Sequence, residues 1–212
     1  MKSNDIFYKK LVMLAEKLVE LNKIRAVSLN HSIMELLVAK HLFDQGYENV
    51  DIEVKIDDLL IADVVGYKEA KVVVEIETGF VPAEYASEPN SYLRARLASK
   101  IARYSFYADV FILAFPTYYI PPIPKILLQR PHDRDPMILR DLKSLVDKYY
   151  KNPPIDYEYL TKAYLHKLYM LDIDEGVVKE LSPEELNEFY NIARNISILS
   201  DKNSYEHTKT YY

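Results

Sequence analysis

The sequence predicts an α/β protein with a mixed β-sheet flanked by helices, and a core that runs helix, strand, strand, strand, helix, strand. Two β-branched, apolar runs at residues 61–67 and 71–77 are joined by a short polar turn, which is typical of a hairpin. Segments with helical spacing precede and follow them at residues 30–45 and 92–107, and an apolar run follows at residues 109–116. Because a helix separates the last two strands, we expect parallel pairing of the last strand with a neighbour.

The composition bounds the class of protein. At 212 residues with 49% hydrophobic residues, the chain is long enough for one substantial domain with a packed core. No apolar run is long enough to span a membrane and the N-terminus does not resemble a signal peptide, so we expect a cytoplasmic protein. Abundant Lys and Glu with scarce Gln are typical of thermophilic proteins.

Several chemistries are excluded. The chain has no cysteine, which excludes disulfides, iron–sulfur clusters and thiolate zinc sites. Its four glycines form neither a phosphate-binding loop nor a dinucleotide fingerprint, so no organic cofactor is expected. The five histidines lack the spacing of a zinc site. A net charge of −5 argues against a generally basic nucleic-acid binder but leaves room for a local basic stripe.

Two helices are expected before the first strand. The first covers residues 5–22, and its apolar residues recur at helical spacing: Ile6, Leu11, Leu14, Leu18 and Leu21. The second starts at Ser28 or Asn30, runs to residue 45 and ends at Gly46. On its helical wheel Glu35 falls inside the apolar arc. Either its carboxylate reaches water at the edge of that arc, or it is directed into a site; the acidic strands that follow favour the second interpretation.

Acidic residues interrupt the predicted strands. Residues 50–56 alternate apolar and polar side chains, as a half-exposed strand does. Asp63 lies in the next strand, and Glu75 and Glu77 lie on one face of the third because the side-chain period is two. A buried carboxylate is costly unless it is paired, hydrogen-bonded or bound to a cation. A hard cation held by oxygen ligands, Mg²⁺ or Mn²⁺, is the economical explanation.

The helix after the acidic strands has a basic face. Residues 80–90 are expected to form a loop, and Ser91 to cap a helix over residues 92–107. Its wheel groups the side chains of Arg96, Lys100, Arg103 and Tyr104. Arg94 lies on another face, where a solvated surface is the simpler interpretation.

The C-terminal half has less informative patterns. Residues 109–116 predict a strand buried on both faces. Residues 117–136 are Pro-rich and basic, and predict equally a DNA-facing loop or a surface connection. Helices are expected at residues 135–149, with Asp135 as cap, at 157–163 and at 182–197. Residues 168–172 and 177–181 favour a hairpin over a continued helix, and a polar tail follows from residue 200.

These motifs resemble the PD-(D/E)XK nuclease superfamily over residues 30–116. Asp63 matches the family's Asp and Glu75 its Glu, but Glu77 stands where the motif Lys is expected. Lys100 and Tyr104 match the spacing of a Lys or Gln and a Tyr found on the helix that follows in similar members. The element order and compact size look most like archaeal Holliday-junction resolvases and related nucleases of archaeal spindle-shaped viruses.

The resemblance implies one nuclease domain over residues 1–212 with a restriction-endonuclease-like core at about residues 28–116. The first helix, a helical C-terminal extension at residues 135–199 and the tail at 200–212 are additions to it. It implies a metal-dependent endonuclease that hydrolyses phosphodiester bonds of DNA, with branched or junction DNA as the candidate substrate, acting as a homodimer. The rival interpretation is a nuclease fold that lost cleavage with its motif Lys and serves as a DNA-binding or assembly module.

The same resemblance assigns roles to residues. Asp63, Glu75, Glu35 and the Ile76 carbonyl are expected to hold Mg²⁺ or Mn²⁺, and Lys100 to replace the motif Lys. Glu77 is expected to be a further metal ligand or a general base, and Tyr104 to belong to the catalytic group. The side chains expected to contact DNA are those of Arg96, Lys100, Arg103, Lys125, Arg130 and Arg134.

Overall fold

The protein is an open six-stranded sheet with helices on both faces. The computed structural model describes residues 3–24 and 28–194. The elements are α1 (Ser3–Lys23), α2 (Leu29–Asp44), β1 (Asn49–Asp57), β2 (Leu60–Tyr67), β3 (Lys71–Ile76), α3 (Pro89–Ser105), β4 (Val110–Pro116), α4 (Pro136–Tyr149), α5 (Tyr157–Lys162), β5 (Lys167–Asp172) and β6 (Val177–Leu181). Residues 183–194 form a further helix. The expected end of that helix near residue 197 and the tail lie outside the described residues.

The strands follow one another across the sheet in chain order, β1-β2-β3-β4-β5-β6. β1, β2 and β3 are antiparallel, β3 and β4 are parallel as predicted, β4 and β5 are parallel, and β6 returns antiparallel to β5. The hairpin of β5 and β6 is confirmed, but it joins the main sheet. The C-terminal extension, expected to be helical apart from this hairpin, therefore also completes the sheet.

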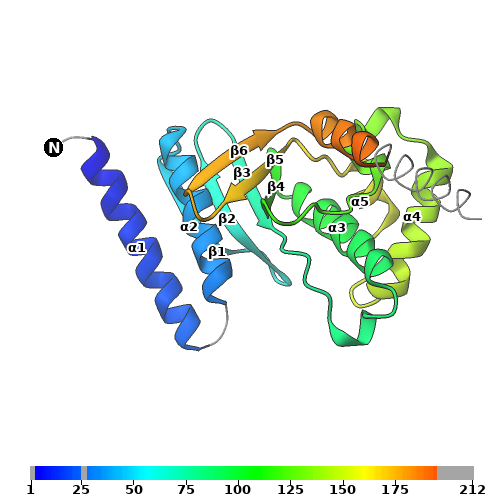
Figure 1. The fold of residues 1–212 in the computed structure, drawn as a ribbon, viewed down its shortest axis with the longest axis horizontal. Coiled ribbons are helices and arrows are strands. Elements are labelled where there is room, and N and C mark those ends of the chain that lie inside the picture. Colours follow the sequence, from blue (N-terminus) through cyan, green and yellow to red (C-terminus); the bar gives the residue numbers. More distant parts are fainter. Residues whose placement is uncertain (1–2, 25–27, 195–212) are drawn as a thin grey trace, which may run out of the picture.

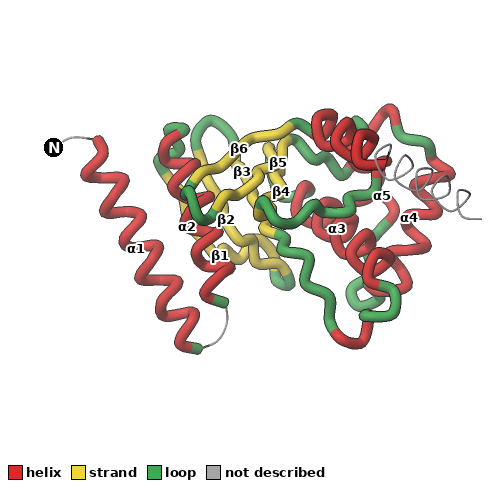
Figure 2. The backbone as a smooth tube through the Cα atoms, viewed as in Figure 1, coloured by secondary structure: helices red, strands yellow, loops and turns green. Residues whose placement is uncertain are grey.

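Two apolar layers lie against the sheet. Figure 1 shows α1 and α2 on one side and α3, α4 and α5 on the other, and Figure 2 shows the strands between the two groups of helices. β4 contributes to both layers, because Phe111 packs toward α3 while Ile112 packs toward α2. Every residue of β4 after Val110 is buried, which confirms the predicted strand buried on both faces.

Local signals define the helix ends. The Ser28 side chain accepts a hydrogen bond from the His31 N–H at 3.3 Å and caps α2, and Asp135 caps α4 through Met137 N at 2.7 Å. Ser182 and Glu185 bond each other's backbone N–H groups, a capping box before residues 183–194. The expected cap at Ser91 is wrong, because α3 already begins at Pro89, whose fixed φ suits the first turn.

The basic connection between β4 and α4 is packed rather than free. Ile123 and Leu127 are buried in the α3 layer. Arg134 is only 6% exposed and donates hydrogen bonds to the carbonyls of Gln129, Leu160 and Thr161. Burial lowers its pKa to about 10. The expectation that Arg134 contacts DNA is therefore wrong, since its guanidinium ties the connection to α5.

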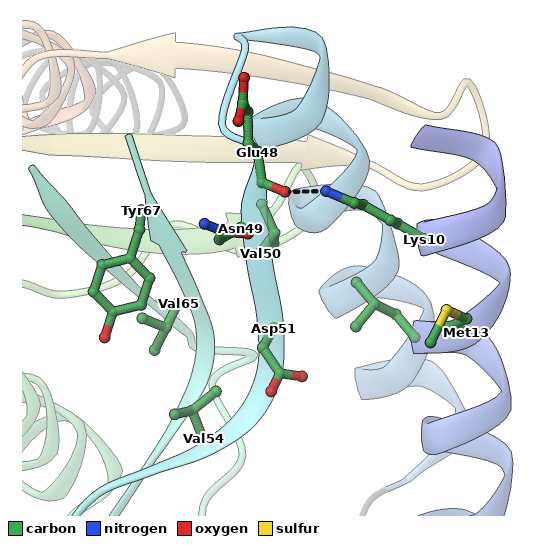
Figure 3. Close-up of a pocket in the computed structure, with 10 residues that line it drawn as sticks. Lys10, Met13, Glu48, Asn49, Val50, Asp51, Val54, Val65 and Tyr67 are labelled. Atoms are coloured by element: carbon green, nitrogen blue, oxygen red, sulfur yellow. Dashed lines mark hydrogen bonds between the residues drawn. The ribbon is translucent and has the colours of Figure 1, made fainter. Parts of the chain in front are cut away.

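Helix α1 packs on α2 and is tied to the edge strand β1. Phe7 stacks on Phe43 of α2, and Lys10 donates to the Glu48 carbonyl at 2.6 Å. A cavity of about 370 Å³ lies between α1 and β1. Figure 3 shows Met13 and Tyr67 on its two sides. No helix among the described residues is long and apolar enough to cross a membrane.

Candidate functional site

The site forms at the level where the apolar side chains of β1 and β2 switch from one face of the sheet to the other. Val50 and Ile52 pack in the α2 layer, whereas Val54 packs in the α3 layer, so the alternation predicted for residues 50–56 is broken. The break falls at Glu53, which has a φ of +47°, in the left-handed region that side chains other than glycine rarely adopt. The partner strand changes faces at the same level, since Ile52 pairs with Val64 and Val54 pairs with Ala62.

The ladder between β2 and β3 also ends at this level, at the pair Val64 and Val74. Beyond it, carboxylates replace the carbonyl acceptors of the ladder. Asp63 N–H donates to Glu75 Oε1 at 3.1 Å, and Ile76 N–H donates to Asp63 Oδ2 at 2.6 Å. Asp63 and Glu75 thereby hold the separated strand ends in place and remain close to each other.

Four side chains form what we call the four-residue cluster: His31, Glu35, Glu53 and Asp63. One ligand atom from each lies within 4.8 Å of all the others. His31 Nε2 lies 3.3 Å from Glu35 Oε1 and 3.2 Å from Asp63 Oδ1. Three carboxylates and one imidazole at these distances are a donor set for a divalent cation.

Glu35 is the residue of the cluster whose carboxylate most lacks hydrogen bonds. Its side chain is 0% exposed, and neither carboxylate oxygen has a hydrogen-bond partner of acceptable geometry within the described part of the chain. Burial, contact with Glu53 and the charge of Asp63 raise its pKa to about 10. Without a cation, burial and the neighbouring carboxylates therefore favour the protonated form of Glu35. A bound cation would satisfy both oxygens and displace the proton.

Lys100 lies between the two carboxylates that hold the strand ends. Its Nζ is 3.1 Å from Glu75 Oε2 and 3.9 Å from Asp63 Oδ2. Burial opposes ionisation of Asp63, but Lys100 and His31 outweigh it and lower the Asp63 pKa. Burial and the charge of Asp63 raise the Glu75 pKa to about 8, against the effect of Lys100. Burial likewise opposes the charge on Lys100, yet Glu75 and Asp63 raise its pKa, so it stays charged.

Two neighbours of Lys100 have contacts that sequence reasoning did not assign. The Ile76 carbonyl, expected to be a metal ligand, accepts a hydrogen bond from Lys100 Nζ at 2.7 Å. The Tyr104 hydroxyl donates to the Ile61 carbonyl at 2.9 Å and braces α3 against β2. The first contact orients the Lys100 ammonium group, and the second holds its helix against β2.

Glu77 is placed apart from the four-residue cluster. It is 1% exposed, and its Oε2 accepts from Arg96 Nε at 2.6 Å. Its Oε1 accepts from the N–H groups of Thr78 and Gly79 at 3.1 and 3.0 Å. This placement departs from the prediction of a metal ligand or general base, because both oxygens are committed to holding the turn after β3.

We expect Glu77→Lys to lower the melting temperature of the protein rather than to restore the activity that the family's usual motif provides. The new cation would face Arg96 and leave the N–H groups of Thr78 and Gly79 without an acceptor. Breaking a buried ion pair costs about 3–5 kcal/mol of the free energy of unfolding. Thermal melting checks this, with Glu77→Gln as a milder control that keeps an acceptor. A Glu77→Lys variant that melts like the wild type and cleaves DNA faster would contradict this structural role.

The remaining basic residues are divided between the interior and the surface. Arg96 is held by Glu77, and Arg103 donates to the Pro153 carbonyl at 2.7 Å and lies over the Tyr150 ring. Lys125 is exposed and bonds Asn191 Oδ1 at 2.8 Å, and Arg130 is exposed. Arg94 is exposed, as expected for a solvated position.

The raised pKa of Glu35 predicts a measurable effect on stability. The pKa of this carboxyl is near 4.5 in the unfolded chain and about 10 in the folded protein. Its contribution to stability is therefore complete below pH 4.5 and is lost as the pH rises toward 10. At pH 8 and without metal, we expect Glu35→Gln to increase the free energy of unfolding by about 2 kcal/mol or more. The gain should shrink as the pH is lowered toward 4.5. Denaturant titrations with a chelator test this, and equal stability of the two proteins at pH 8 would refute it.

Sequence reasoning missed His31 and Glu53. The signal for His31 was present, because it lies four residues before Glu35 and therefore on the same face of α2. Glu53 was assigned to the solvent side of β1, and no feature of the sequence indicates the positive φ that turns it inward.

Comparison of the chain with protein-family models, with curated protein sequences and with solved structures found no significant match.

Proposed function

We propose that the protein is a metal-dependent DNA endonuclease of the PD-(D/E)XK type, in which the six-stranded sheet contains a restriction-endonuclease-like core. The observation that carries this proposal is the fully buried carboxylate of Glu35, whose oxygens have no hydrogen bond of acceptable geometry among the described residues and which faces His31, Glu53 and Asp63 at the separated ends of β2 and β3. A buried acid without a partner is costly in a protein with no ligand, and a cation removes the cost.

The donor set fits Mn²⁺ better than Mg²⁺. Carboxylates suit both ions, but an imidazole ligand favours transition metals, and Mg²⁺ requires near-ideal octahedral oxygen coordination. When bound, the cation supplies an activated water molecule and neutralises charge on the phosphate. His31, Glu35, Glu53 and Asp63 would hold it.

The chain's own residues would stabilise the negative charge that develops on the phosphate. Lys100 remains charged between Glu75 and Asp63, so it can donate to a phosphate oxygen as negative charge develops there. Glu75 fixes the ammonium group, and Tyr104 holds α3 at the distance that lets Lys100 reach. In this proposal Lys100 performs the task of the motif Lys that Glu77 replaces.

A cleavage assay separates this function from that of a non-cleaving DNA-binding or assembly module. Four-way junction, flap, single-stranded and duplex DNA would each be incubated with Mn²⁺, Mg²⁺ or a chelator. We expect cleavage with Mn²⁺, slower cleavage with Mg²⁺ and none with the chelator. Tight metal-independent binding without cleavage of any substrate would favour the binding module.

We further propose that the chain forms a homodimer through the outer stripe of α1, defined as Tyr8, Val12, Ala15 and Val19. These residues are spaced by four, three and four positions, as in a coiled-coil seam, and Tyr8 and Val19 are 69% and 54% exposed. In an antiparallel pair of α1 helices, Lys9 of one copy faces Glu16 of the other, so the two charge pairs are complementary.

Light scattering tests the dimer. We expect a dimer at micromolar concentration, and a monomer for Val12→Glu because the charge falls inside the apolar seam. Phe189→Glu, which places the same charge on an exposed aromatic position near the C-terminus, is the matched control. A wild-type monomer at micromolar concentration, or a dimer split only by Phe189→Glu, would exclude the interface on α1.

A further inference from the structure

A second cavity opens directly beside the four-residue cluster. It has a volume of about 330 Å³, and its lining includes His31 and Met34 of α2, Thr78 and Phe80 after β3, and Tyr118 after β4. No acidic residue from the described part of the chain lines it, in contrast to the neighbouring cluster. Phe80 is 66% exposed and Tyr118 is 73% exposed, so two aromatic residues of this cavity, which His31 of the cluster also lines, are open to solvent.

The turn before Phe80 is fixed by the buried carboxylate of Glu77. Glu77 accepts the N–H groups of both Thr78 and Gly79, and Arg96 holds the other oxygen of Glu77. Gly79 has a φ of +78°, and a Cβ at this position would collide with the Tyr119 ring. The buried ion pair and the close packing on Tyr119 therefore fix the backbone that leads into Phe80.

The turn that carries Tyr118 is also tied to the sheet. Thr117 N–H donates to the Leu171 carbonyl at 3.0 Å, which extends the pairing of β4 and β5. Tyr119 N–H donates to the Pro116 carbonyl at 3.0 Å and closes the turn. Two large rings held in the open by ordered turns forgo the stabilisation that burial would give them, which is typical of a binding surface.

We propose that Phe80 and Tyr118 form an aromatic clamp that stacks on an unpaired base of the DNA strand, next to the phosphodiester bond held at the four-residue cluster. This inference rests on the proposed nuclease function and names the form of DNA that the site takes. Aromatic stacking is available only to a base that has left its duplex, and it tolerates any base because each has a π face. It also gives affinity without a basic surface, which agrees with a net charge of −5.

The test uses oligonucleotides with 2-aminopurine, a fluorescent base that is quenched when it stacks. Single-stranded DNA, and duplex DNA with the probe at a flap or junction, would be bound in Ca²⁺ in place of Mn²⁺. We expect the wild type to quench an unpaired probe. Phe80→Ala and Tyr118→Ala should each lose the quenching and weaken binding roughly tenfold, the order expected for one stacked base.

Matched variants separate stacking from folding. Phe80→Tyr and Tyr118→Phe keep the rings and should keep both signals, and Phe189→Ala removes an exposed aromatic side chain elsewhere and should change neither. Melting temperatures confirm that all variants are folded. Unchanged affinity and quenching in the two Ala variants, or an equal loss of affinity for fully paired duplex, would overturn the clamp.

The same samples distinguish the clamp from the nuclease function. If the wild type cleaves DNA in Mn²⁺ and the Ala variants quench normally, the clamp fails and the nuclease stands. If the wild type quenches unpaired probes through Phe80 and Tyr118 but cleaves no DNA, the nuclease fails and the clamp stands.

Discussion

Replacing Asp63 with Ala is expected to abolish metal-dependent DNA cleavage while leaving the fold intact. Asp63 contacts His31, lies near Lys100 and accepts from Ile76 N–H, so it joins the four-residue cluster to the end of β3. Its loss leaves one backbone N–H unpaired, which costs about 1–3 kcal/mol. It also removes a charge that raises the pKa values of Glu35 and Glu75, which offsets part of that cost in the metal-free protein.

Glu75→Ala is expected to have the same effect on cleavage, because Lys100 then loses the carboxylate that fixes it. Cleavage rates measured beside circular dichroism and melting curves separate loss of chemistry from loss of fold. Asp63→Asn is the closest control, since its side-chain oxygen can still accept from Ile76 N–H. Normal cleavage by either Ala variant, or unfolding of both, would contradict the assignment.

Lys100→Ala is expected to lower the cleavage rate by at least about a hundredfold, the order seen when one donor to the transition state is removed. DNA affinity should change little, because a single phosphate contact contributes modestly beside the whole binding surface. Single-turnover kinetics measure the cleavage rate, and binding in Ca²⁺ measures the DNA affinity separately.

Arg94→Ala is the matched control, since Arg94 is an exposed cation on the same helix and should be nearly silent. A second control is the melting temperature, because Lys100 also neutralises two buried carboxylates. Unchanged single-turnover cleavage by a folded Lys100→Ala protein would show that another group performs the task of the motif Lys.

The layout of the fold is predictable because its elements depend on local patterns. Helical spacing defines α1 and α2, and the apolar run of β4 predicts a strand buried on both faces. The pairing of β5 with β4 is not predictable in the same way, because it depends on contacts between distant parts of the chain. The segment before α4 was ambiguous for a related reason, since only packing shows that Arg134 is turned inward.

The candidate site was predictable to the extent that burial of charge was visible in the sequence. Glu35 falls in an apolar helical arc, and its carboxylate is indeed buried. The resemblance implied that Lys100 reaches the site, and its Nζ lies beside Glu75. Glu53 was not predictable, because strand alternation directs its side chain to solvent. Its own left-handed backbone conformation turns the side chain inward instead. Glu77 resembled a ligand by spacing alone, yet its partner Arg96 lies on the next helix.

The most direct test of the proposed metal site is a crystal soaked in Mn²⁺ and measured for anomalous scattering. We expect one strong peak within coordination distance of the carboxylates of Glu35 and Asp63, with His31 Nε2 as a further ligand. In Glu35→Gln crystals the peak should be weaker or absent. A wild-type crystal without a peak among these residues at millimolar Mn²⁺, or with its only peak elsewhere on the surface, would contradict the proposed metal centre.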